Sequence, residues 1–248
     1  MESKFVDIHA HMSDKAFGHV ASLFSDLEDG FIVLNAGENH ADNERTFELS
    51  RKHTNILPCA GFHPNSMYDK PLSEVDREFE LVAKDIDRAF AVSEIGLDYR
   101  GKDESSRFIQ KKYFEDILRL AEKEGKVCIV HSRKAIDDVL SAITSFRVKV
   151  IIHNFEGNLS HLARATDMGV GISISTGFLK FKRDNVIKNA NADSLFVETD
   201  SPVLSPDERA NTPLNLPRII EYMSLLRNTG FNLLKDKLYN NFERFFNG

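Results

Sequence analysis

The sequence has no tryptophan, only two cysteines and no apolar run long enough to span a membrane. Cys59 and Cys128 each lie within an apolar segment, so we expect two buried thiols that form neither a disulfide nor a metal site. The first residues also lack the basic segment followed by an apolar one that is typical of a secretory leader. These absences predict a cytoplasmic protein with no membrane association.

The sequence also lacks an excess of positive charge, since 32 Lys and Arg residues stand against 38 Asp and Glu residues, for a net charge of −6 at pH 7. This balance argues against broad nonspecific binding of duplex nucleic acid, although a local basic rim around a site is compatible with it. The 248 residues, 42% of them hydrophobic and 28% charged, are typical of one globular domain. We therefore expect a single domain over residues 1–248.

Short apolar segments alternate with longer amphipathic segments along the whole chain. The segments that are rich in Val and Ile predict eight strands, at residues 5–9, 31–36, 56–62, 90–95, 127–131, 148–153, 170–175 and 195–199. Their apolar residues do not alternate strictly with polar ones, which is typical of parallel strands buried on both faces. The clearest helix is predicted at 105–124, where apolar residues follow i, i+3, i+4, i+7 before Gly125, and two more are predicted from Thr212-Pro213 onward and near the C-terminus.

Eight such units in a chain of this length predict an α/β fold, specifically a (β/α)8 TIM-like barrel. A doubly wound open sheet is the competing interpretation. Against it, the first strand is not followed by a Gly-rich phosphate-binding loop.

Metal-binding side chains gather at the ends of the predicted strands. His9 and His11 are spaced i, i+2 in the first strand region, so both imidazoles can face one cation. This pair alone is a weak signal, but His63, His131 and His153 follow later strands, Glu94 lies in the fourth strand, and Asp200 follows the last one. Because catalytic groups of a (β/α)8 barrel come from the C-terminal ends of its strands, we expect a single site. The other four histidines, His19, His40, His53 and His161, are interpreted as surface residues.

The predicted ligand set exceeds what one tetrahedral ion can hold and suits two divalent cations, with Mg, Mn or Zn left open. The six expected ligands are His9, His11, Glu94, His131, His153 and Asp200. Glu94 is central in the strand order and would bridge the two cations, one bound also by His9, His11 and Asp200, the other by His131 and His153. Asp200 would remain ionised beside a cation, orient the attacking water and accept its proton.

These residues lie in segments that resemble the TatD-type deoxyribonucleases of the metal-dependent hydrolase (amidohydrolase) superfamily. The matching segments are 6–11 (VDIHAH), 61–64 (GFHP), 93–99 (SEIGLDY), 131–135 (HSRKA), 153–157 (HNFEG), 198–202 (ETDSP) and 241–246 (NFERFF). The resemblance implies a TIM-like barrel, divalent cations and hydrolysis of phosphodiesters, often from the 3′ end of single-stranded DNA. It also implies that His63 and Arg133 contact the substrate phosphate.

The chain departs from the family pattern around the expected pocket mouth. Ser132 stands where the family usually has Cys, Glu156 adds a negative charge, and the loop at 209–213 has a loosened Arg-x-Asn-x-Pro arrangement. These departures affect the expected substrate preference more than catalysis. Cations on the loops after the fourth, fifth and seventh strands could still rim the site, and Tyr99 is expected to contact the substrate.

The sequence thus predicts a divalent-metal-dependent hydrolase with a two-metal-activated water, most specifically a 3′–5′ exonuclease on single-stranded DNA, with no obligate protein partner. One alternative is a metal-dependent hydrolase of another ester or amide bond, for example an aminoacyl-tRNA editing deacylase. Another is a non-catalytic binding protein, against which the complete set of six ligands argues.

Overall fold

A single sheet of eight parallel strands forms the centre of the computed structural model, which describes residues 3–18 and 21–247. The strands are β1 (Phe5–Ala10), β2 (Phe31–Asn35), β3 (Ile56–Ala60), β4 (Ala91–Asp98), β5 (Cys128–Arg133), β6 (Val150–Ile152), β7 (Gly171–Ser175) and β8 (Leu195–Glu198). Each strand pairs with the next one along the chain. This order confirms the predicted (β/α)8 barrel and excludes the doubly wound sheet, whose strand order reverses direction.

The barrel closes where the first strand meets the last. The backbone N–H of Asp200 donates to the carbonyl of His9 at 2.9 Å, and the N–H of His11 donates to the carbonyl of Ser201 at 2.7 Å. Deeper in the barrel, a side chain links the first and last strands where a backbone carbonyl would otherwise do so. Oδ1 of Asp7 accepts the N–H of Thr199 at 3.0 Å. The closure brings the ends of the chain's first and last strands side by side.

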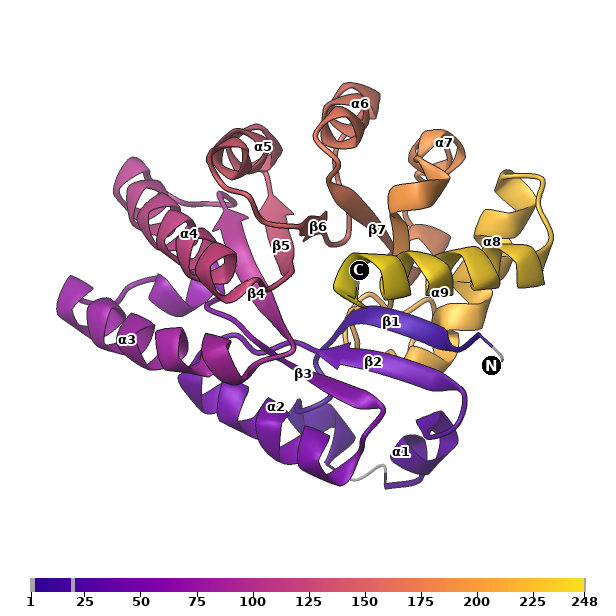
Figure 1. Cartoon of the computed structure of the whole chain (residues 1–248), viewed down its shortest axis with the longest axis horizontal. Helices are drawn as coiled ribbons and strands as arrows, with labels where there is room; N and C mark the ends of the chain where they lie inside the picture. Colours follow the sequence, from indigo (N-terminus) through magenta and orange to yellow (C-terminus); the bar gives the residue numbers. More distant parts are fainter. Residues whose placement is uncertain (1–2, 19–20, 248) are drawn as a thin grey trace.

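Helices surround the strands on the outside of the barrel (Figure 1). They are α1 (Ala21–Leu27), α2 (His40–Lys52), α3 (Leu72–Arg88), α4 (Glu104–Glu124), α5 (Ile136–Ala142), α6 (Leu159–Asp167), α7 (Asp184–Asn189), α8 (Leu216–Leu226) and α9 (Phe231–Asn247). The predicted helix at 105–124 corresponds to α4, which begins after an Asp103 cap and ends at Gly125 in the left-handed conformation. A 3-10 turn, Pro213–Asn215, occupies the predicted start of α8, because the fixed φ of proline suits either kind of helical turn.

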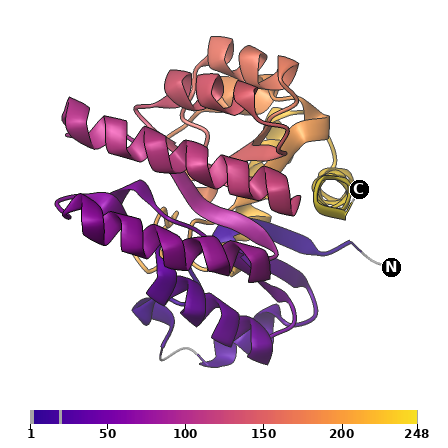
Figure 2. The same cartoon turned by 60° about the vertical axis from the view of Figure 1, so that its left-hand side comes forward.

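Two hydrophobic clusters stabilise this arrangement. The larger one fills the space between the strands and the helices, while the smaller one joins several strands to Phe242 of α9. Both views show α9 beside β1 (Figure 2). Cys59 and Cys128 are buried free thiols, as predicted.

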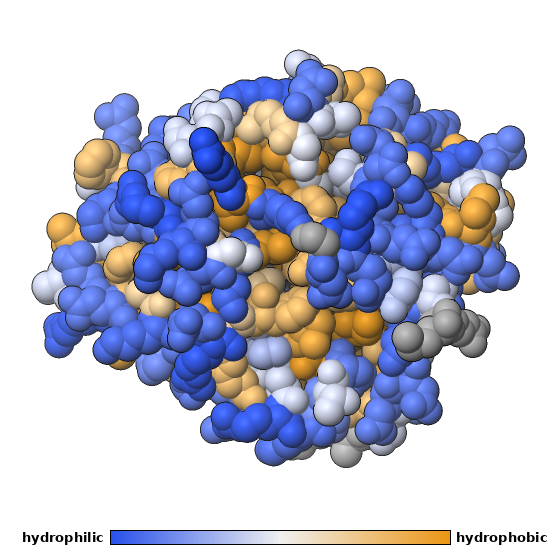
Figure 3. Space-filling view, viewed as in Figure 1, coloured by the Kyte–Doolittle hydropathy of each residue, from blue (hydrophilic) through white to orange (hydrophobic). Residues whose placement is uncertain are grey.

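Hydrophilic residues dominate the face shown in Figure 3, and hydrophobic residues are most visible near its centre. Across residues 3–18 and 21–247, none of the helices combines the length and the apolar character needed to cross a bilayer.

Candidate metal centre

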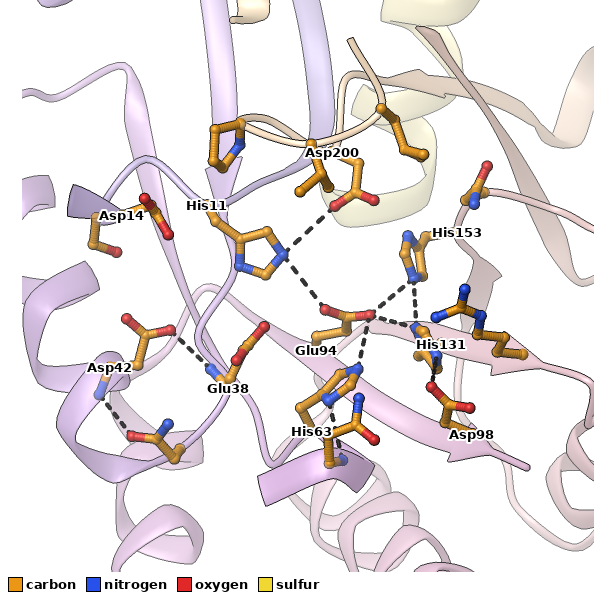
Figure 4. Close-up of a pocket in the computed structure, with 18 of the residues that line it drawn as sticks. His11, Asp14, Glu38, Asp42, His63, Glu94, Asp98, His131, His153 and Asp200 are labelled. Carbon is orange, nitrogen blue, oxygen red and sulfur yellow. Dashed lines mark hydrogen bonds and ion pairs between the residues drawn. The ribbon is translucent and has the colours of Figure 1, made fainter. Parts of the chain in front are cut away.

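All six predicted ligands converge at the ends of β1, β4, β5 and β6 and just after β8. Figure 4 shows His11, Glu94, His131, His153 and Asp200. Nε2 of His9 and Nε2 of His11 each lie 3.5 Å from Oε2 of Glu94 and 3.6 Å from Oδ1 of Asp200. These separations are too long for hydrogen bonds. Two ligand atoms that each lie about 2.1 Å from a tetrahedral cation are about 3.4 Å apart, which is close to these separations. The four side chains therefore fit one divalent cation.

The other carboxylate oxygen of Glu94 faces a second group of imidazoles. Oε1 lies 2.7 Å from Nδ1 of His131, 3.0 Å from Nε2 of His153 and 3.5 Å from Nε2 of His63. Because its two oxygens face different groups, Glu94 could contact a cation held by either group. His63 lies with this second group and joins the candidate ligands, while its contact with a substrate phosphate stays a prediction.

The electrostatics keep the two central acids ionised. Burial by itself would raise the pKa of Glu94, but the charges of His63 and His153, the nearby ring of His11 and the hydrogen bond from His131 hold that pKa well below its usual range. Burial likewise opposes ionisation of Asp200, yet the nearby rings of His11, His9 and His153 lower its pKa. Both acids therefore carry the negative charge that cation ligands require.

Three imidazoles of the centre have a second polar neighbour behind them. Ser93 Oγ lies 3.1 Å from Nδ1 of His9, Glu198 Oε1 lies 3.3 Å from Nδ1 of His153, and Asp98 Oδ2 lies 3.5 Å from Nε2 of His131. Of these contacts, the one to His9 is a hydrogen bond, while the carboxylates behind His131 and His153 are close enough to favour a ring N–H that points toward them. The sequence pattern alone predicts no role for Ser93, Asp98 or Glu198. Strand periodicity could have suggested two of them, because Asp98 and Glu198 are separated from Glu94 and Asp200 by an even number of residues.

Two glycines allow the strands to approach closely enough to build the centre. A Cβ on Gly61 would lie 2.1 Å from the backbone N of Glu94, and one on Gly96 would lie 2.1 Å from the carbonyl oxygen of His131. Gly96 also has a φ of 137°, in a region that other residues rarely adopt. Backbone contact thus sets the spacing of β4 from its neighbours, and with it the positions of two candidate ligands.

The candidate centre lines a cavity of about 890 Å³. Arg133 also lines it, as expected of a substrate contact, together with Lys15, Arg45 and the carboxylates Asp14, Glu38, Asp42 and Glu156. Tyr99 is not among the lining residues, because its ring is buried and its hydroxyl donates to Asp138 Oδ2 at 2.7 Å. The structure therefore brings Arg133 to the centre but turns Tyr99 away from it.

The histidines outside the strand ends have local structural contacts. His40 Nδ1 lies 2.9 Å from Asp85 Oδ2, His53 stacks on Phe24, and His161 completes a capping box at the start of α6. All three are half-buried, so each keeps part of its side chain at the surface. His19 lies outside the described residues.

Comparisons with known proteins agree with this geometry. Residues 6–247 match the sequence model of the TatD related DNase family. An uncharacterized metal-dependent hydrolase of Methanocaldococcus jannaschii is 29% identical over 98% of this chain and 97% of its own length. The deoxyribonuclease TATDN3 of Homo sapiens is 26% identical over 90% of this chain and 87% of its own. The crystal structure of YJJV, a TatD homologue from Escherichia coli K12, covers all of both chains with a TM-score of 0.88 at 22% identity, which shows the shared barrel. Since the family match runs from β1 through α9, the chain belongs to the TatD family of metal-dependent hydrolases.

Proposed function

We propose that this protein is a 3′–5′ exonuclease that hydrolyses phosphodiester bonds of single-stranded DNA with two divalent cations. The observation that carries the proposal is the position of Glu94, whose two carboxylate oxygens face separate sets of ligand atoms. Cations held there would activate a shared water and offset the charge that develops on the attacked phosphate. The deoxyribonuclease names of relatives such as TATDN3 support DNA as the substrate.

Asp200, Arg133 and His63 have proposed parts in this reaction. Asp200 lines the cavity and stays ionised, so its carboxylate can accept the proton of the attacking water. Arg133 presents a fixed positive charge at the cavity wall and would hold the phosphate by paired hydrogen bonds. His63 would help to orient the phosphate or complete the second ligand group. The bond that breaks joins the phosphorus to the 3′ oxygen of the penultimate nucleotide, which leaves as the new 3′ hydroxyl.

A cleavage assay on 5′-labelled single-stranded DNA and RNA tests the proposal. The protein is stripped of metal and then given Mg²⁺, Mn²⁺ or Zn²⁺ in turn. We expect a ladder from the 3′ end that requires added metal, and a loss of about 10²–10⁴-fold in kcat for Asp200→Asn. Asp116→Asn, which changes a carboxylate on the surface of α4, serves as the matched control. Failure to cleave DNA or RNA with any metal, in folded and metal-loaded protein, would refute the nuclease assignment.

The acidic lining of the cavity favours one second candidate, a metal-dependent hydrolase of another ester or amide, such as an aminoacyl-tRNA deacylase. Asp14, Glu38, Asp42 and Glu156 could attract the amino group of an aminoacyl ester. Arg133→Ala separates the two candidates. It should greatly reduce cleavage of a charged phosphodiester and affect a neutral ester much less.

A further inference from the structure

One side of the cavity carries carboxylates that the proposed metal centre does not use. Glu38 follows β2, and Asp42 lies in the first turn of α2. Figure 4 shows both, with Asp14 nearby, on the opposite side of Glu94 from His131 and Asp98. A carboxylate oxygen of Glu38 lies within 4.8 Å of ligand atoms of His11 and Glu94. A negative charge therefore borders the reacting centre on this side.

The backbone holds Glu38 in a fixed position. Its N–H donates to Asp42 Oδ2 at 3.1 Å, while its carbonyl accepts the N–H of His63 at 2.9 Å and the hydroxyl of Ser66 at 3.0 Å. Three hydrogen bonds thus tie it to α2 and to the turn after β3. The backbone of residue 38 is therefore fixed, which keeps the origin of its side chain at the cavity wall.

The carboxylate of Glu38 is available to a ligand. Within residues 3–18 and 21–247, it forms no ion pair and no hydrogen bond of its own with another side chain. The nearby cation Arg45 is engaged by Asp42, whose Oδ1 lies 2.8 Å from its Nη2. Glu38 can accept a hydrogen bond from a neutral hydroxyl, but it repels a second phosphate placed against it.

The position of Arg133 sets the direction of the substrate. Arg133 belongs to β5, whereas Glu38 follows β2. Strands β3 and β4 lie between them in the barrel, so the two side chains come from different sides of the cavity. The phosphates of the DNA chain are favoured near this arginine. The side of the cavity with Glu38 and Asp42 is therefore left for the sugar of the terminal nucleotide.

We propose that Glu38, reinforced by Asp42, is a specificity residue that accepts a hydrogen bond from the 3′ hydroxyl of the terminal nucleotide and excludes any phosphate from that position. The inference rests on the proposed exonuclease function. An internal nucleotide and a 3′-phosphorylated end both place a phosphate where the terminal hydroxyl would lie. One carboxylate therefore disfavours both internal cleavage and phosphorylated ends.

The test compares three single-stranded DNA substrates of one sequence: linear with a 3′ hydroxyl, linear with a 3′ phosphate, and circular. We expect the wild-type protein to prefer the hydroxyl end by about tenfold or more and to leave circles intact. Glu38→Gln keeps the size and an acceptor oxygen, and should reduce that preference about tenfold. Glu156→Gln removes a carboxylate from another part of the same cavity and should not change the ratio. Equal use of both ends by the wild-type protein, or an unchanged ratio in Glu38→Gln, would overturn the inference.

A binding measurement tests the same inference without turnover. Calorimetry on metal-loaded protein compares deoxyadenosine 5′-monophosphate with deoxyadenosine 3′,5′-bisphosphate. We expect the monophosphate to bind more tightly to the wild-type protein, and Glu38→Gln to reduce this difference. Asp42→Asn provides a second variant if Glu38→Gln does not fold. Absence of cleavage would refute the exonuclease function, whereas cleavage or binding without discrimination would refute only the role of Glu38.

Discussion

Oε1 of Glu198 lies 3.3 Å from Nδ1 of His153, whose other ring nitrogen lies 3.0 Å from Glu94. The same oxygen of Glu198 accepts the N–H of Asn154 at 2.7 Å, and its carboxylate is fully buried. The His153 ring is thus fixed between two carboxylates. Because such a partner orients a metal-binding histidine and increases its basicity, we predict that Glu198→Gln weakens binding of the second cation about 10–100-fold.

Titration calorimetry of metal-stripped protein with Mn²⁺ or Zn²⁺ measures this effect. Glu221→Gln, an exposed change on α8, is the control. Wild-type affinity in a folded Glu198→Gln protein would show that the contact has no role in metal binding.

The number of bound cations tests the proposed bridge. We predict two equivalents of Zn²⁺ for the wild-type protein and one each for His11→Ala and His131→Ala, since these residues belong to different ligand groups. Glu94→Ala should weaken both sites. Equilibrium dialysis with elemental analysis gives the stoichiometry, and added metal should raise the Tm of each variant in proportion to the sites that remain. Two tightly bound equivalents in Glu94→Ala would contradict the bridge.

The closure of the barrel depends on Asp7. Its Oδ1 accepts the N–H groups of Thr199 and His9, and burial raises its pKa to about 8. Asn preserves an acceptor oxygen in a group of the same shape, whereas Ala leaves buried N–H groups without an acceptor. We predict a loss in the free energy of unfolding of about 1 kcal/mol for Asp7→Asn and about 2–4 kcal/mol for Asp7→Ala. Urea unfolding of metal-stripped protein measures both, and equal losses would argue against the hydrogen-bonding role.

Gly96 tests the close approach of β4 and β5. Gly96→Ala places a Cβ 2.1 Å from the carbonyl oxygen of His131 and strains a backbone with a φ of 137°. We predict a loss of stability of about 2–4 kcal/mol, accompanied by weaker binding at the group that contains His131. Gly30→Ala is the matched control, because its Cβ would meet no atom within 4 Å. If both substitutions had the same effect, steric contact at Gly96 would not set the spacing of the strands.

The strands and the ligand positions could be predicted from the sequence because each is a local pattern, an apolar run that ends in a histidine or an acid. Contacts between distant elements could not. Asp138 of α5 accepts a hydrogen bond from the hydroxyl of Tyr99. Tyr99, which was expected to contact the substrate, therefore faces a helix. His63 was expected at the site as a contact for the substrate phosphate, but its position against Glu94 depends on the pairing of β3 with β4, which no spacing within one segment reveals. Glu38 belongs to none of the recognised motifs, and only the fold places its carboxylate beside the centre.

The hydrogen bond from the N–H of Asp200 to the carbonyl of His9 has a consequence for biosynthesis. The two residues come from opposite ends of the chain, and α9 packs on both β1 and β8. During translation, His9 leaves the ribosome long before its partners exist, and contacts this distant in sequence form late. A nascent chain that stops before β8 would therefore have an open sheet edge and no complete cation site. Such a truncated chain would be prone to aggregate and would not act as an enzyme of reduced activity.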